Sequence, residues 1–137
     1  MPPFSLPWRS RLLFWLQLSL VAGALYDLFF AALMVLAPEL PQRLLELTPP
    51  PEPYLWLIAV FLAMLAGFYL YAAYDPVSYE GNVLIAIAGR GIGAAVMGYV
   101  AWREPALWGF GCLAAGDLCF AVAHAAFYLP IRPLITH

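Results

Sequence analysis

The fold is decided by a run of 26 residues, LLFWLQLSLVAGALYDLFFAALMVLA (residues 12–37), in which Asp27 is the only charged side chain. A helix of this length crosses about 30 Å of hydrocarbon with some tilt, and only helices or closed barrels satisfy their own backbone in lipid. Arg9 and Arg11 precede the run, and residues 22–24 have the small side chains of a signal-peptide cleavage site. Because the apolar run continues well beyond that site, we interpret it as an uncleaved first transmembrane helix.

Three further apolar runs follow, at residues 54–73, 83–102 and 106–129. Each has the roughly 20 residues that a transmembrane helix requires. The Asp75-Pro76 turn joins the second run to the third, and residues 103–105 form a minimal hairpin before the fourth. Such short connections make the joined helices antiparallel neighbours. The sequence therefore predicts an all-α membrane protein, an antiparallel four-transmembrane-helix bundle that forms a single domain over residues 1–137.

The one long connection lies between the first and second runs. Within it, Leu40, Leu44 and Leu47 recur at helical spacing, with charged side chains on the opposite face. This pattern predicts a short amphipathic helix in the membrane interface, followed by a stiff segment at residues 49–51, which are all proline. We interpret the connection as resting on the lipid headgroups; a lid and a docking surface are the functional alternatives.

Composition places the whole chain in the membrane. Hydrophobic residues make up 65% of it and charged residues 10%, against roughly a quarter charged in soluble domains. Lysine is absent and the net charge is −2, which argues against nucleic acid as a partner. We expect a polytopic integral membrane protein. The cytoplasmic side is expected to hold both termini, because three arginines lie on that side and two on the other: Arg9, Arg11 and Arg132 against Arg43 and Arg103.

Asp27, Arg90 and Asp117 lie near the middle of three different predicted helices. A charge at the bilayer centre costs about 2.5–3.5 kcal/mol, so such residues face a protein interior and find partners. We expect Arg90 to pair with Asp117, because their helices are neighbours, and Asp27 to be a second ligand or protonated. If all three are ionised their sum is −1, so either one carboxyl is neutral or a further cation shares the site. His124 is the candidate, since it lies two helical turns from Asp117 on the same stripe.

Several functions fit this polar centre. The first is an ion pair that fixes helix register, and the second is a pocket for a small polar or quinone-like ligand. The third is a proton relay in which Asp27 titrates. No catalytic motif or metal-ligand set is visible in the sequence, so no catalytic residue, metal or cofactor is assigned and an enzyme is not expected. The other histidine is His137, which does not allow a bis-histidine haem site within one chain.

Three groups of residues carry a family resemblance: Gly67-Phe68-Tyr69-Leu70-Tyr71-Ala72-Ala73-Tyr74-Asp75-Pro76, then Ala88-Gly89-Arg90 with Gly93-Ala94, and Gly116-Asp117-Leu118 with Phe120 and His124. They resemble those of small bacterial four-helix membrane proteins that are broadly DoxX-like, and the resemblance implies a bacterial inner membrane as the location. The resemblance covers about residues 20–130, and it singles out Asp75, Arg90, Asp117 and His124. It implies an accessory role, because some DoxX-type proteins are small subunits of quinone-linked oxidoreductases. We therefore expect a non-catalytic accessory or scaffold subunit with a membrane-protein partner or a homodimer; the alternatives are a ligand- or quinone-binding redox component and proton-coupled transport.

Overall fold

The computed structural model describes residues 7–134, and within that range it contains helices and no strand. It confirms the predicted all-α bundle with a short helix between the first two long ones. Residues 1–6 and 135–137, including His137 and both chain ends whose side of the membrane was predicted, lie outside the described residues. The α-helices are α1 (Pro7–Leu36), α2 (Glu39–Leu45), α3 (Glu52–Tyr74), α4 (Glu80–Arg103) and α5 (Trp108–Tyr128), with 3-10 turns η1 (Pro105–Leu107) and η2 (Arg132–Leu134).

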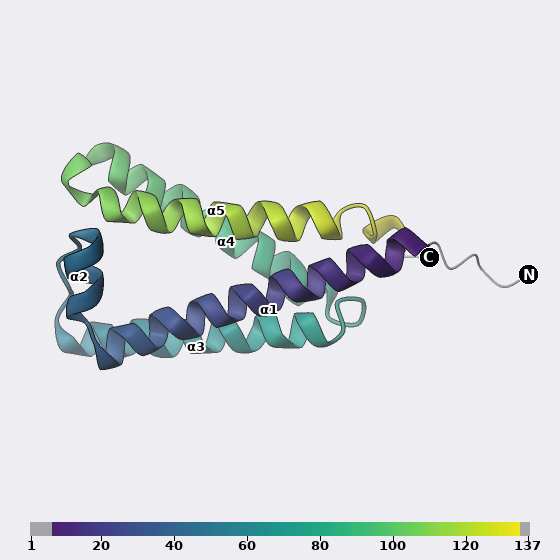
Figure 1. Ribbon diagram of the computed structural model, residues 1–137, viewed down its shortest axis with the longest axis horizontal. Helices are drawn as coiled ribbons and strands as arrows, with labels where there is room; N and C mark the ends of the chain where they lie inside the picture. Colours follow the sequence, from purple (N-terminus) through teal and green to yellow (C-terminus); the bar gives the residue numbers. More distant parts are fainter. Residues whose placement is uncertain (1–6, 135–137) are drawn as a thin grey trace, which may run out of the picture.

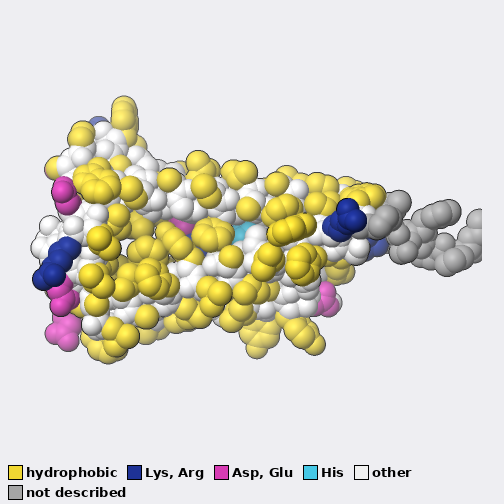
Figure 2. Space-filling model, viewed as in Figure 1, with side chains coloured by type: hydrophobic (Ala, Val, Ile, Leu, Met, Phe, Trp, Pro, Cys, Tyr) yellow, Lys and Arg dark blue, Asp and Glu magenta, His cyan; other side chains and the backbone are white. Residues whose placement is uncertain are grey.

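The four long helices, α1, α3, α4 and α5, are long and apolar enough to cross a membrane. Apolar side chains cover the middle of the molecule, while charged side chains gather at its two ends (Figure 2). This is the surface of an integral membrane protein. The helix bounds agree with the predicted runs to within a few residues, except that α1 begins at Pro7 and η1 forms a separate turn before α5.

The long helices pack as two antiparallel pairs (Figure 1). The most extensive contacts join α1 to α3 and α4 to α5, while α1 meets α5 and α3 meets α4 over smaller areas. The predicted pairing of the last two helices is therefore confirmed. Small residues allow these two to approach closely, since a Cβ added at Gly111 would lie 3.5 Å from the Ala101 Cβ.

The apolar core lies at the end of the bundle where α1 begins and α5 ends. Leucines of α1 meet alanines of α3 there, and the alanines let the helices come close enough to exclude voids. Glu80 completes this end, because it accepts a hydrogen bond from Tyr128 Oη and a second, at 3.2 Å, from Arg132 Nε. The core residues are Leu16, Leu20, Ala24, Ala66, Tyr69, Ala72, Ala73, Val83, Ala86, Tyr128 and Ile131.

The helix α2 closes the opposite end, where it lies across the bundle beside α5 (Figure 1). A Cβ added at Gly109 would lie 2.2 Å from the Leu45 carbonyl oxygen, so glycine is what permits this contact. Trp108 Nε1 also donates a 3.1 Å hydrogen bond to Glu46 Oε2. The helix is shorter than the predicted leucine pattern, because Glu46 adopts a left-handed φ of 53° and ends it before Leu47. Leu40 and Leu44 are exposed.

The turn between α3 and α4 is built around Asp75 and the buried Pro76. The Asp75 carboxylate accepts hydrogen bonds from the Val77 and Ser78 backbone N–H groups, each at 3.1 Å, and from Ser78 Oγ at 2.6 Å. The Ser78 hydroxyl, aided by the two N–H groups, lowers the pKa of Asp75 below its ordinary value. The Asp75 carboxylate thus stabilises the turn by accepting hydrogen bonds from the residues that follow it.

Candidate functional site

Arg90 of α4 lies at the centre of the bundle and is only 4% exposed. Its Nη2 donates to Asp27 Oδ1 at 2.7 Å and to the Gly23 carbonyl at 2.9 Å, both on α1. Its Nη1 donates to Asp117 Oδ1 on α5. The structure therefore brings together all three charged residues that the sequence placed in mid-membrane, and one guanidinium joins α1, α4 and α5 through charge-assisted bonds.

Three aromatic rings enclose the same guanidinium. Tyr26 of α1 has its ring centroid 5.2 Å from Arg90 Cζ, and the rings of Tyr69 on α3 and Phe120 on α5 lie at 5.1 Å. The Arg90 side chain of α4 is thus in contact with residues of the other three long helices. Rings at this distance attract a cation by about 0.5–2 kcal/mol each, more where water is excluded. They also lower the local dielectric, which strengthens the two ion pairs.

The two carboxylates make the same kind of hydrogen bond to Arg90 but differ in their exposure. Within the described chain, each uses Oδ1 for its hydrogen bond to Arg90, and neither Oδ2 atom accepts one. The Asp27 side chain is 2% exposed and that of Asp117 is 14% exposed. Asp117 is therefore the accessible member of the centre.

His124 lies beside the polar centre but has a partner of its own. The ring is fully buried, and its Nδ1 lies 3.0 Å from Ser19 Oγ. Ser19 Oγ also lies 2.9 Å from the Leu16 carbonyl oxygen, so this hydroxyl bridges the α1 backbone and the His124 ring. Nε2 of His124 lies near Gly23 and has no hydrogen-bond partner among the described residues.

The hydrogen bond of His124 therefore goes to Ser19 and not to either carboxylate, unlike the shared cation that the sequence suggested. Ser19 was missed by the sequence reasoning. The available signal was a hydroxyl in the middle of an apolar helix, because a buried polar group requires a partner.

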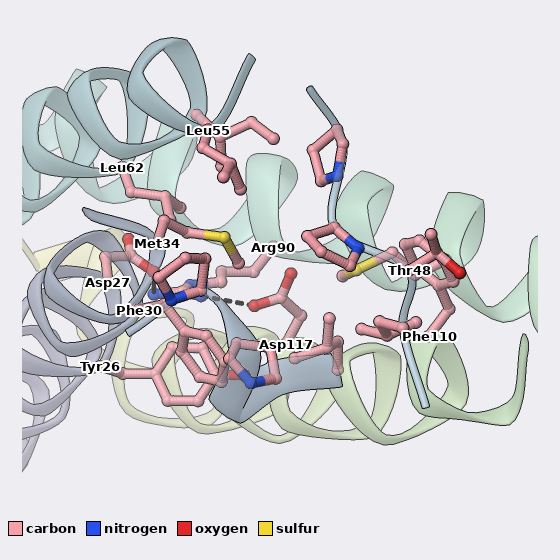
Figure 3. Close-up of a pocket in the computed structure, with 18 residues that line it drawn as sticks. Tyr26, Asp27, Phe30, Met34, Thr48, Leu55, Leu62, Arg90, Phe110 and Asp117 are labelled. Carbon is pink, nitrogen blue, oxygen red and sulfur yellow. Dashed lines mark hydrogen bonds and ion pairs between the residues drawn. The ribbon is translucent and has the colours of Figure 1, made fainter. Parts of the chain in front are cut away.

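A cavity of about 410 Å³ opens from the polar centre toward α2. It lies between the α1–α3 pair and the α4–α5 pair, and its lining on α1 runs from Tyr26 to Met34, about 12 Å at 1.5 Å per residue. Figure 3 shows it in close-up, with Arg90 and Asp117 at one end. It is lined by Tyr26, Asp27, Phe30, Met34, Pro38, Pro41, Leu47, Thr48, Pro49, Pro50, Leu55, Ile58, Leu62, Arg90, Met97, Phe110, Leu113 and Asp117.

The lining divides into an apolar body and a polar end. Its only charged side chains are Asp27, Arg90 and Asp117, and the connector from α1 to α3 supplies a roof rich in proline. The second carboxylate oxygen of Asp117, Oδ2, lies against Gly93 of α4, where an added Cβ would come within 2.8 Å of it. His124 does not line this cavity. The arrangement suits an elongated molecule with one polar end.

Among residues 7–134, no group of three or more His, Cys, Asp or Glu side chains is placed to hold a metal ion. Comparisons with family models, with curated proteins and with solved structures find no match to this chain. The DoxX-like resemblance therefore stays a prediction, and the function has to be inferred from the geometry of the polar centre and its cavity.

Proposed function

We propose that this integral membrane protein is a non-catalytic binding protein that holds one amphiphilic molecule between its two helix pairs. The apolar body of the ligand lies beneath α2, and its polar head meets the centre formed by Asp27, Arg90 and Asp117. One observation carries this proposal: the cavity ends on the polar centre. Its volume, about 410 Å³, lies in the roughly 300–1,000 Å³ range of small-molecule sites, which combine apolar walls with a few polar groups.

The cavity favours binding over a purely structural ion pair. A pair that only fixes helix register is best served by tight packing on every side, because voids forfeit dispersion contacts. Here the pair is packed on the side of Tyr69 and opens into a cavity on the side of Met34 and Leu62. The centre therefore serves both purposes, holding the helices and receiving the head of a ligand.

The same geometry argues against a transport path. Proton-coupled transport through Asp27 requires that the centre open to each face of the membrane in turn. The cavity reaches the centre from the α2 end, while the other end is filled by Leu16, Leu20 and Tyr128, all with no exposed surface. A bound ligand therefore enters and leaves by one side, as in a binding protein.

We further propose that the protein works as an accessory subunit in a bacterial inner membrane, beside a partner protein or a second copy of itself. The resemblance to DoxX-like proteins supports this setting. A non-catalytic role fits the centre, because Arg90 and both carboxylates are bonded to one another instead of being held apart for acid–base chemistry. In that setting a quinone-like molecule is the ligand that the resemblance suggests.

Native mass spectrometry of the protein, released from lipid nanodiscs, tests the binding function. We expect an added mass of one small molecule, retained in Leu118→Trp and lost in Leu113→Trp. Both leucines are on α5, but Leu113 lines the cavity and Leu118 is 54% exposed on the outside. Met97→Trp fills the cavity from α4 and gives an independent check if Leu113→Trp folds poorly. A wild-type protein without a bound molecule, or binding that survives both filling variants, would overturn the proposal.

A further inference from the structure

We infer that the ligand is a cationic amphiphile, a molecule with an ammonium or protonated amine head on an apolar body. This inference rests on the proposed binding function and names the chemical class of its ligand. It follows from three features of the cavity: the sum of its charges, the unused carboxylate oxygens, and the aromatic faces next to them.

The charges that line the cavity do not balance. Arg90 is the one cation in the lining, and Asp27 and Asp117 are two anions, so the ionised centre has a net charge of −1. His124 does not line the cavity, and its hydrogen bond goes to Ser19 and not to either carboxylate. An uncompensated charge in an apolar interior is costly, and a ligand that brings one positive charge makes the centre neutral.

The free acceptor sites lie on the carboxylates. Asp117 Oδ2 accepts no hydrogen bond within the described chain, and its side chain is the most exposed of the three. This oxygen lies beside Gly93 of α4, at the end of the cavity that Asp117 lines. An ammonium N–H group of the ligand would bond there, as a charge-assisted contact. A quaternary head would instead approach the same oxygen without a hydrogen bond.

Aromatic side chains stand where the head would lie. Tyr26 and Phe30 both line the cavity, and their ring centroids are 4.8 Å apart. Tyr26 already contacts the Arg90 guanidinium, so this wall accepts positive charge. Aromatic faces are the surfaces that recognise quaternary ammonium groups. The combination of one carboxylate and two rings therefore fits a cation with alkyl substituents.

Other heads fit the centre less well. A carboxylate or phosphate head would meet Asp117 before it reached Arg90, and like charges repel strongly in an apolar site. A neutral quinone carbonyl needs a hydrogen-bond donor. The two Nη atoms of Arg90 donate to Asp27, Asp117 and the Gly23 carbonyl, while its Nε–H has no partner among the described residues. Because a donor remains, the choice between a neutral and a cationic head rests on the charge of the site. The charge balance of the site thus favours a cation over the quinone-like ligand.

Three probes with the same chain test the inference: dodecyltrimethylammonium, dodecanol and dodecanoate. Their dissociation constants are measured calorimetrically with the protein in zwitterionic nanodiscs, and Leu113→Trp protein provides the background from partition into lipid. We expect the ammonium probe to bind at least tenfold more tightly than the alcohol, and dodecanoate to bind most weakly. Asp117→Asn should reduce ammonium binding at least tenfold while leaving the alcohol within twofold, whereas Leu118→Trp should change neither.

The outcomes separate the ligand class from the binding function. Equal binding of ammonium and alcohol, both lost in Leu113→Trp, would overturn the cationic head and leave the binding function standing. Binding of all three probes that is unchanged in Leu113→Trp would overturn both. If Asp117→Asn does not fold, Asp27→Asn removes the same charge from the less exposed side, and a loss of ammonium preference is again expected.

Discussion

The two ends of the bundle are built from similar residues and reach opposite results. At the end where α1 begins, leucines meet alanines and the interior is filled, with Leu16, Leu20 and Val83 all at 0% exposure. At the α2 end, equally apolar helices enclose about 410 Å³ of space. There α2 and the proline-rich connector span the distance between the helix pairs, so the pairs do not close on one another. Apolar composition determines that helices enter the membrane, while side-chain size and connectors determine whether their interior is filled.

Arg90 lies at the boundary between the two ends, and we expect its replacement to lower the stability of the protein more than any other change considered below. Arg90→Leu leaves Asp27 and Asp117 buried without a partner, so we expect the free energy of unfolding to fall by about 3–5 kcal/mol. Denaturation with increasing mole fractions of sodium dodecyl sulfate, followed by circular dichroism, measures this loss.

The matched control removes all three charges. A triple variant with leucine at positions 27, 90 and 117 should regain most of the lost stability, because replacing a buried ion network by apolar groups is close to neutral. If the single variant were as stable as the wild type, the centre would contribute nothing to the packing of the four helices.

The filled and hollow ends should respond differently to the same truncation. Leu16→Ala opens a new void in the core, and we expect a loss of roughly 2–3 kcal/mol. Leu62→Ala only enlarges an existing cavity, so its loss should stay below about 1 kcal/mol, because few packing contacts are removed. Equal losses, measured by the same denaturation, would mean that the α2 end is packed as tightly as the core in the membrane.

Contact between α2 and α5 gives a third test. Gly109→Ala places a Cβ against the Leu45 carbonyl oxygen, so α2 must move, and we expect a loss of about 1–2 kcal/mol with faster release of the bound molecule. Gly111→Ala is the control, because its Cβ would meet only Ala101 at an ordinary 3.5 Å. Identical melting temperatures and release rates for the two variants would contradict the role of α2 as the roof of the cavity.

The convergence of Asp27, Arg90 and Asp117 was predictable, because each is a charge at mid-depth in an apolar helix and lipid offers no alternative partner. The cavity was not predictable. It depends on the distance between the helix pairs at the end where α2 packs against α5, and no residue pattern in the sequence gives that distance. The hydrogen bond between His124 and Ser19 was not predictable either. The spacing of residues along one helix shows which of them share a face, but not which hydroxyl of another helix lies opposite that face.

The smallest expected effect lies at the Asp75 turn, outside both ends of the interior. Hydrogen bonds from Ser78 and Val77 lower the pKa of Asp75 in the folded protein. The ionised Asp75 therefore stabilises the fold above its ordinary pKa of about 3.9, and this stabilisation is lost as the pH falls through the lowered value. Thermal unfolding between pH 6 and about pH 3 should therefore show a small loss in the wild type that Asp75→Asn lacks. An unchanged pH profile in Asp75→Asn would assign the loss to other carboxylates.

The bond between Asp27 and Arg90 joins residues 63 positions apart in the chain. Synthesis on the ribosome proceeds from the N-terminus, so α1 and α3 reach the translocation machinery while Arg90 has not yet been made. For that interval Asp27 is a lone acid in an apolar helix, at a cost of about 2.5–3.5 kcal/mol if ionised. The hairpin of α1 and α3 therefore carries this cost until α4 delivers the guanidinium, so the third membrane span is the one that removes it.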